Sequence, residues 1–93
     1  YLKYFPSDEY INLIVGGIYF DKKEYKKSLH YFDISKSKLK AKEVYIYSGM
    51  SHYFLVQDQQ AIEDLAQVLK FDLTKSEEAE IYYVIGICKN NIR

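Results

Sequence analysis

Few residues in this chain of 93 offer the chemistry that catalysis or metal binding requires. His30, His52 and Cys88 are the strongest candidate ligands for a soft metal ion, and no two of them are spaced as a ligand pair, so no metal site is expected. Cys88 and a histidine could form a thiol nucleophile, but no third group that would orient them is evident. A small packed hydrophobe is the favoured interpretation of Cys88. We expect no enzyme activity and no cofactor.

Two further patterns resemble functional motifs and have simpler explanations. Gly16-Gly17 lacks the later Gly-Lys-Ser/Thr of a phosphate loop and lies inside a helical pattern. Glu77, Glu78 and Glu80 cluster where a helix is predicted to begin, and the helix dipole favours anions there. The elements that organise the chain are therefore more informative than its reactive side chains.

Composition and charge indicate one small folded domain. Apolar residues make up 48% of the chain and charged residues 28%, with equal numbers of each sign, which supports a core and argues against disorder. One Pro and four Gly are few for an all-β chain of many tight turns. We expect a single domain over residues 1–93 that forms part of a longer chain. The lone cysteine favours a reducing compartment such as the cytoplasm, while an exported or lipid-anchored parent chain stays open.

The charges are unevenly placed along the chain. Residues 1–42 carry nine Lys and five acids, or +4, whereas residues 43–93 carry four basic residues and eight acids, or −4. Such a dipolar chain could orient a charged partner or stack on its own copies. It lacks the net basic face of a nucleic-acid binder, so nucleic acid is not an expected partner. No apolar run approaches the ~18 residues of a membrane span, so no transmembrane segment is expected.

Apolar residues recur at helical spacing and predict five helices. The predicted helices cover residues 8–20, 22–36, 41–56, 58–71 and 77–91. Asp21 with Glu24, and Thr74 with Glu77, have the spacing of a capping box, and Asp58 is suited to be an N-cap. Connections of ~2–8 residues between such helices favour antiparallel neighbours.

Small residues recur at a nearly regular interval. Gly16, Gly49 and Gly86 follow one another along the chain, and the second interval is slightly longer than the first. Large, small and aromatic residues stand at matching distances from these glycines. The full set is Gly16, Tyr19, Tyr25, Ser28, Phe32 and Ser35 in the first unit, Tyr45, Gly49, His52, Ala61, Leu65 and Val68 in the second, and Tyr82 and Gly86 in the third.

This pattern resembles the tetratricopeptide repeat (TPR) family, whose unit is a helix–turn–helix of about 34 residues. The resemblance implies an all-α fold of antiparallel helix–turn–helix repeats, stacked as a short right-handed α-solenoid. Repeat one would cover residues 9–41, repeat two residues 42–75, and a closing helix residues 77–91. Asn12, Lys40 and Asp58 depart from the family pattern. A generic helical bundle with coincidental glycine spacing remains the alternative.

The resemblance also implies a function. In that family, ligands usually lie against the first helix of each repeat, which lines a concave face. The side chains implied to line this face are Leu13, Phe20, Ile46, Met50, Tyr53, Tyr83 and Ile87. We therefore expect a non-catalytic adaptor that binds a peptide or helix of a partner protein. Some family members grip a terminal carboxylate with Lys and Asn, but Leu13 and Gly17 occupy those places here.

Several alternatives stay open. The groove residues could simply pack on one another or on residues 1–5. The chain could instead be a self-associating structural domain, a homo-oligomer held by its open ends and its opposite charges, or an accessory domain of a larger enzyme. Eight lysines between residues 22 and 42 could dock an acidic protein, an anionic lipid or a nucleic acid, although a solvated face is the favoured interpretation.

Overall fold

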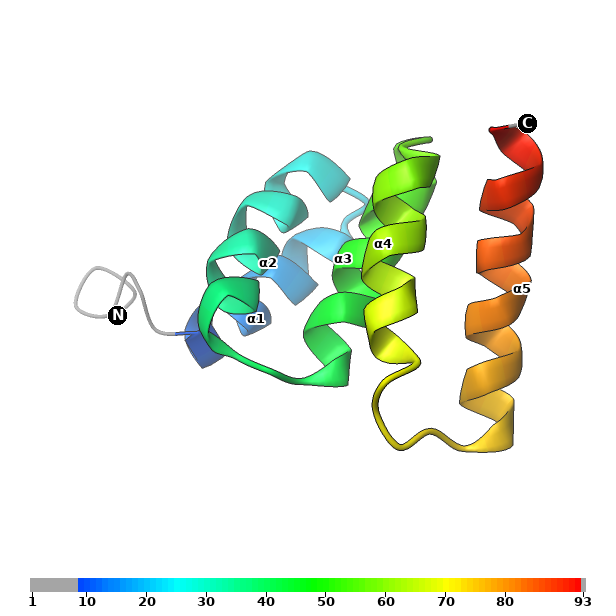
Figure 1. Ribbon diagram of the computed structural model, residues 1–93. Coiled ribbons are helices and arrows are strands. Elements are labelled where there is room, and N and C mark those ends of the chain that lie inside the picture. The colour runs from blue at the N-terminus through cyan, green and yellow to red at the C-terminus, as the bar shows by residue number, and fades with distance from the viewer. Residues whose placement is uncertain (1–8, 93) are drawn as a thin grey trace.

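The computed structural model describes residues 9–92, which fold into five α-helices without any strand (Figure 1). The helices are α1 (Glu9–Asp21), α2 (Tyr25–Lys38), α3 (Lys42–Phe54), α4 (Asp58–Val68) and α5 (Lys75–Asn91). Each helix packs against the next one along the chain, and α1 and α5 lie at opposite ends of the row. The predicted all-α fold of stacked, antiparallel helix pairs is therefore confirmed.

The turn between α1 and α2 is closed by backbone hydrogen bonds. The N–H of Lys23 donates to the carbonyl of Phe20, and the N–H of Glu24 donates to the carbonyl of Tyr19, both at 2.9 Å. Lys23 has a φ of 64°, in the left-handed region. This is the Schellman arrangement, which satisfies the carbonyls at the end of a helix.

The turn between α3 and α4 repeats these bonds at the equivalent positions of the second unit. The N–H of Val56 donates to the carbonyl of Tyr53 at 3.1 Å, and the N–H of Gln57 donates to the carbonyl of His52 at 2.8 Å. Val56 has a φ of 60°, which a β-branched residue seldom adopts. The same turn therefore forms in the second unit although Val56 does not favour a positive φ. This indicates that the two helix pairs are copies of one structural unit.

The predicted helix starts are partly wrong. The Asp21–Glu24 capping box does not form, because α1 extends to Asp21 and the backbone bonds of the turn set the start of α2 at Tyr25. Gln57, not Asp58, is the N-cap of α4 for the same reason. The capping box of Thr74 is confirmed, and it starts α5 at Lys75, earlier than predicted. The predicted start of the first helix, at residue 8, lies outside the described residues.

Two of the three glycines mark tight helix crossings, as predicted. A Cβ built on Gly16 would lie 2.6 Å from the ring of Phe32 on α2. A Cβ built on Gly49 would lie 2.7 Å from Leu65 on α4. Both large side chains stand at the same distance along the chain from their glycine and are fully buried. Each crossing therefore places a large apolar side chain directly on a bare stretch of backbone.

The third glycine does not mark such a crossing. A Cβ on Gly86 would meet nothing within 4 Å, and Tyr82, expected to pack beside it, is 58% exposed. The prediction for these two residues is wrong because no described helix covers that side of α5. The adjacent side of α5 is covered, since Ile81 and Ile85 join Leu65 and Val68 of α4 in the main apolar cluster.

None of the described helices has the length and apolarity needed to cross a membrane.

The glycine crossings can be tested by adding one methyl group. We expect Gly49→Ala to lower the free energy of unfolding by about 1–3 kcal/mol, because the new Cβ would overlap the branch point of Leu65. Gly17→Ala is the matched control, since a Cβ there meets nothing within 4 Å and Ala is favoured over Gly in a helix by about 1 kcal/mol. Urea unfolding followed by circular dichroism measures both. Equal effects of the two substitutions would contradict the crossing.

Candidate functional site

Specific polar contacts hold the start of α5 beside the start of α3. The side chain of Thr74 accepts a hydrogen bond from the N–H of Glu77, and the Glu77 carboxylate accepts one from the N–H of Thr74. Lys42, the first residue of α3, donates to both carboxylate oxygens of Glu77, at 3.2 and 3.0 Å. One glutamate thus caps α5 and ties it to α3.

A concavity of about 210 Å³ lies where α3 and α5 run past each other. Five of its lining side chains are apolar and one is acidic; they are Ile46 and Met50 from α3 and Glu80, Ile81, Tyr83 and Val84 from α5. We call it the α3–α5 pocket. Its size suits one large apolar side chain of a ligand.

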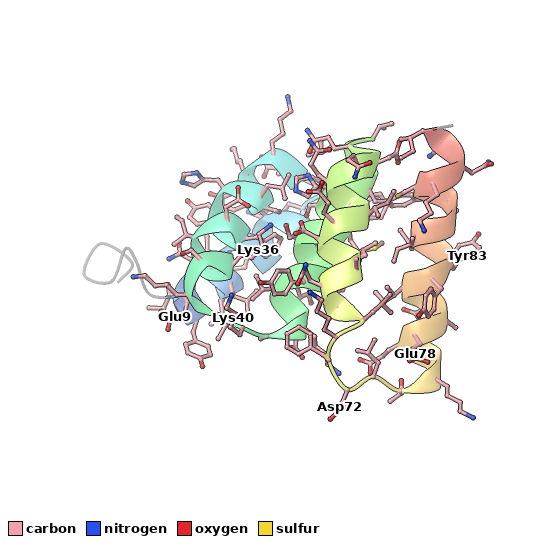
Figure 2. All side chains as sticks on the ribbon, in the orientation of Figure 1. Glu9, Lys36, Lys40, Asp72, Glu78 and Tyr83 are labelled. Atoms are coloured by element: carbon pink, nitrogen blue, oxygen red, sulfur yellow. The ribbon has the colours of Figure 1, made fainter. Side chains whose placement is uncertain are left out.

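The rim of the α3–α5 pocket combines an exposed aromatic ring with negative charge. Tyr83 is 71% exposed and projects from α5 into solvent (Figure 2). Glu80 lies on the same helix, and Glu43 is exposed on α3, one helical turn before Ile46 and so on the same side of the helix. The pocket therefore offers an apolar floor next to carboxylates, which favours an apolar side chain with a basic neighbour.

The side chains predicted to form one groove separate into groups. Ile46, Met50 and Tyr83 meet in the α3–α5 pocket. Leu13 and Ile87 are half-buried outside its lining.

Phe20 belongs to a second group, an aromatic cluster where α1, α2 and α3 meet. Its ring centre lies 5.4 Å from that of Tyr25 and 5.2 Å from that of Tyr47, and Tyr25 stacks on Phe54 at 4.8 Å. Tyr53 reaches the same cluster through Phe54, at 5.3 Å. These rings pack mainly on one another, so they form less of a free surface than the sequence predicts.

A polar cluster joins the two helix pairs. Asp64 of α4 is buried, and its carboxylate accepts hydrogen bonds from Lys36 Nζ of α2 at 2.9 Å and from Ser48 Oγ of α3 at 2.6 Å. His52 Nε2 lies 3.6 Å from the same carboxylate, while its Nδ1 contacts Gln57 at 2.6 Å. Lys36 lies on the side of α2 that faces α3 and α4 (Figure 2).

This cluster contains serine, histidine and aspartate, but its geometry does not suit nucleophilic catalysis. Ser48 is completely buried and donates to Asp64, whereas a nucleophilic serine must be reachable and bonded to the histidine. The cluster instead links three helices. No sequence pattern indicates this cluster, because Lys36 and Asp64 are far apart in the chain and lie on helices whose relative register only the fold sets.

The lysines between residues 22 and 42 are not one uniform solvated face. Lys36 and Lys42 are partly buried in ion pairs with Asp64 and Glu77, so the solvated-face interpretation is wrong for these two. It holds for the exposed lysines of the segment, namely Lys22, Lys23, Lys26, Lys27, Lys38 and Lys40. An open concavity of about 310 Å³ lies beside some of them, at the turn before α2.

Cys88 is buried against α4, as predicted. Burial, followed by the hydrogen bond to Asp58, raises the pKa of the Cys88 thiol to about 11. The thiol is therefore protonated at neutral pH and is a poor nucleophile. Asn91 also donates to Asp58 at 3.4 Å, so this aspartate links α4 to the end of α5.

Comparison with protein-family models, with curated proteins and with solved structures finds no match to this chain. The repeat is visible within the chain itself, because the same turn and the same glycine crossing occur at matching positions of two successive units.

The polar cluster predicts a large difference between two lysine substitutions. Lys36→Met removes the only lysine that contacts the buried Asp64 carboxylate among residues 9–92, and we expect it to lower the free energy of unfolding by about 2 kcal/mol. Lys40→Met, at an exposed position, should change it by less than about 0.5 kcal/mol. Chemical unfolding at neutral pH measures both. A loss of similar size at Lys40 would contradict a specific role for Lys36.

The attachment of α5 predicts a dependence on acid pH. The N–H of Thr74, followed by the side chain of Lys42, lowers the pKa of Glu77 below its ordinary value of 4.5. Because the folded-state pKa is depressed, the Glu77 carboxylate stabilises the fold above pH 4.5, and this contribution is lost as the pH falls below 4.5.

Thermal unfolding between pH 6 and pH 3 tests this with Glu77→Gln, which keeps an acceptor for the capping bond but removes the charge. We expect the variant to melt below the unmodified chain at pH 6 and the two to converge towards pH 3. Glu63→Gln, at an exposed position on α4, is the control and should show no such convergence. A difference at Glu77 that stays constant with pH would refute the assignment.

Proposed function

We propose that this chain is a non-catalytic protein-interaction module, similar to TPR domains, that binds a segment of a partner protein in the α3–α5 pocket. The observation that carries the proposal is the pocket itself: a concavity of about 210 Å³ with apolar walls between the first helices of two successive units. Small, mostly apolar hollows with a few polar groups at the rim are the usual form of a binding site.

The repeat character of the chain supports this function. Helix pairs that stack in register present their first helices on a common side, and α3 and α5 are the first helices of units two and three by their glycine register. This is also the side on which the TPR resemblance places a ligand. Residues Ile46, Met50 and Tyr83, selected by that resemblance, meet in the pocket.

The pocket chemistry narrows the class of ligand. Ile46, Met50, Ile81 and Val84 provide an apolar floor, and Met side chains adapt to ligands of different shape. Tyr83 can close over a bound side chain at a low entropy cost. Glu80 lies at the rim and can pair with Lys or Arg. The expected ligand is a peptide or helix that inserts one large apolar residue and carries a basic residue beside it.

A designed peptide tests the pocket directly. The probe is an acetylated, amidated amphipathic peptide of Leu, Lys and Ala, and its match is the same peptide with each Leu replaced by Ser. We expect the first peptide to shift the amide signals of Ile46, Met50 and Tyr83 in an NMR titration and the second to shift none of them. Tyr83→Ala should weaken binding about tenfold, as loss of an aromatic contact typically does.

Tyr82→Ala is the matched control, since it truncates the same side chain at the adjacent position on another side of α5. It should leave peptide affinity unchanged. Equal loss of affinity in both variants, or shifts confined to the aromatic cluster around Phe20, would rule out the α3–α5 pocket as the binding site.

A further inference from the structure

One side of α5 has the pattern of a helix crossing but no helix against it. We call it the outer face of α5 and define it by Glu78, Ala79, Tyr82, Gly86 and Lys89, all of which are exposed. At about 100° per residue these five side chains fall within one side of the helix. The helix α5 lies at the end of the row opposite α1 (Figure 1), and a Cβ on its Gly86 would meet nothing within 4 Å.

The other two units show what such a face does. On α1 and α3 the glycine is covered by a large side chain, Phe32 or Leu65, whose atoms would come within 2.7 Å of an added Cβ. The helix α5 also has a glycine at the equivalent position, Gly86, where a Cβ would meet nothing within 4 Å. A glycine within a helix is unfavourable, so the packing of a single copy does not explain it. Tyr82 likewise exposes more than half of its surface without a ring partner in residues 9–92.

The charges on the outer face of α5 indicate which partner can bind there. Glu78 stands near the start of α5 (Figure 2), and Lys89 stands about three helical turns later on the same side. Neither forms an ion pair with another described residue. Two copies of such a helix, placed antiparallel, set the acid of each opposite the lysine of the other. The face is therefore complementary to itself.

We propose that a second copy of this chain docks on the outer face of α5 through its own α5, in an antiparallel two-fold pair. With the two-fold axis near residues 83 and 84, Glu78 lies level with Lys89 of the second copy, and Tyr82 lies close to the level of the second copy's Gly86. Each tyrosine ring then rests on bare backbone, as Phe32 does on Gly16. Both kinds of contact occur at one register, and a two-fold interface makes each of them twice, so the dimer has four contacts.

The interface is small, which defines the expected strength. A single helix against a single helix falls at or below the roughly 1,000 Å² of buried surface typical of stable complexes. We therefore expect a reversible dimer that dissociates on dilution rather than a permanent one. The proposal does not rest on the proposed function, because the α3–α5 pocket uses a different side of α5.

Charge reversal provides the test. Sedimentation velocity of the 93-residue chain, from about 10 µM to about 1 mM at low salt, should show a monomer–dimer equilibrium. Glu78→Lys alone and Lys89→Glu alone should each weaken the dimer about tenfold or more, because two attractive contacts become two repulsive ones. An equal mixture of the two variants should form heterodimers, since each copy then faces the opposite charge. The double variant should dimerise like the unmodified chain.

Gly86→Tyr provides a second test, in which a bulky side chain blocks the proposed interface. The new side chain points into open space in a single copy, so the circular dichroism spectrum should be unchanged, whereas the second copy's Tyr82 can no longer approach the backbone. Dimerisation should be abolished. A chain that stays monomeric to about 1 mM overturns the proposal. So does a dimer that ignores the charge reversals, which would indicate another surface, such as exposed Ile14 and Ile18 of α1.

Discussion

The close approach of two helix backbones at a glycine is the contact on which this fold depends. Gly16 admits the ring of Phe32 and Gly49 admits the side chain of Leu65, so each helix pair is held at a short, fixed distance. The large side chain replaces the volume that a Cβ would occupy and is itself fully buried. Because the glycine faces of α1 and α3 are covered in this way, only other faces of these helices are left for the neighbouring unit and for solvent. Ile46 and Met50, on one such face of α3, line the α3–α5 pocket.

Between units, charged and polar contacts supplement the apolar packing. Lys36 reaches Asp64 and Lys42 reaches Glu77, and in both pairs the lysine belongs to the positive half of the chain and the acid to the negative half. The opposite charges of the two halves of the chain therefore pair in part with each other within one molecule. Of the two carboxylates only that of Asp64 is buried, and a buried carboxylate is stable only with its partners in place, so the Lys36–Asp64 pair favours this one placement of α2 against α4.

Local rules predicted the features that depend on nearby residues. The Thr74–Glu77 capping box needs only four consecutive positions, and the crossings at Gly16 and Gly49 follow from spacing within one helix pair. The Asp21–Glu24 prediction failed because a backbone turn, here imposed on Lys23, satisfied the same groups. The link between Lys36 and Asp64 and the meeting of Met50 with Val84 depend on how whole helices are placed, which no short pattern encodes.

Gly86 is the position where the repeat pattern and the packing of the single chain disagree. Positions that break a local rule without a gain within the fold are where function is most often found, and here the disagreement lies on the helix that also forms one wall of the α3–α5 pocket. The two features use different sides of α5: Ile81 and Val84 face inwards, whereas Tyr82 and Gly86 face outwards. Pairing through the outer face leaves both pockets open and relates them by a two-fold axis. Two modest sites joined in this way bind a ligand with two anchors more tightly than either site alone, because the second contact becomes intramolecular. A weak pocket and a weak dimer would then reinforce each other without any new contact.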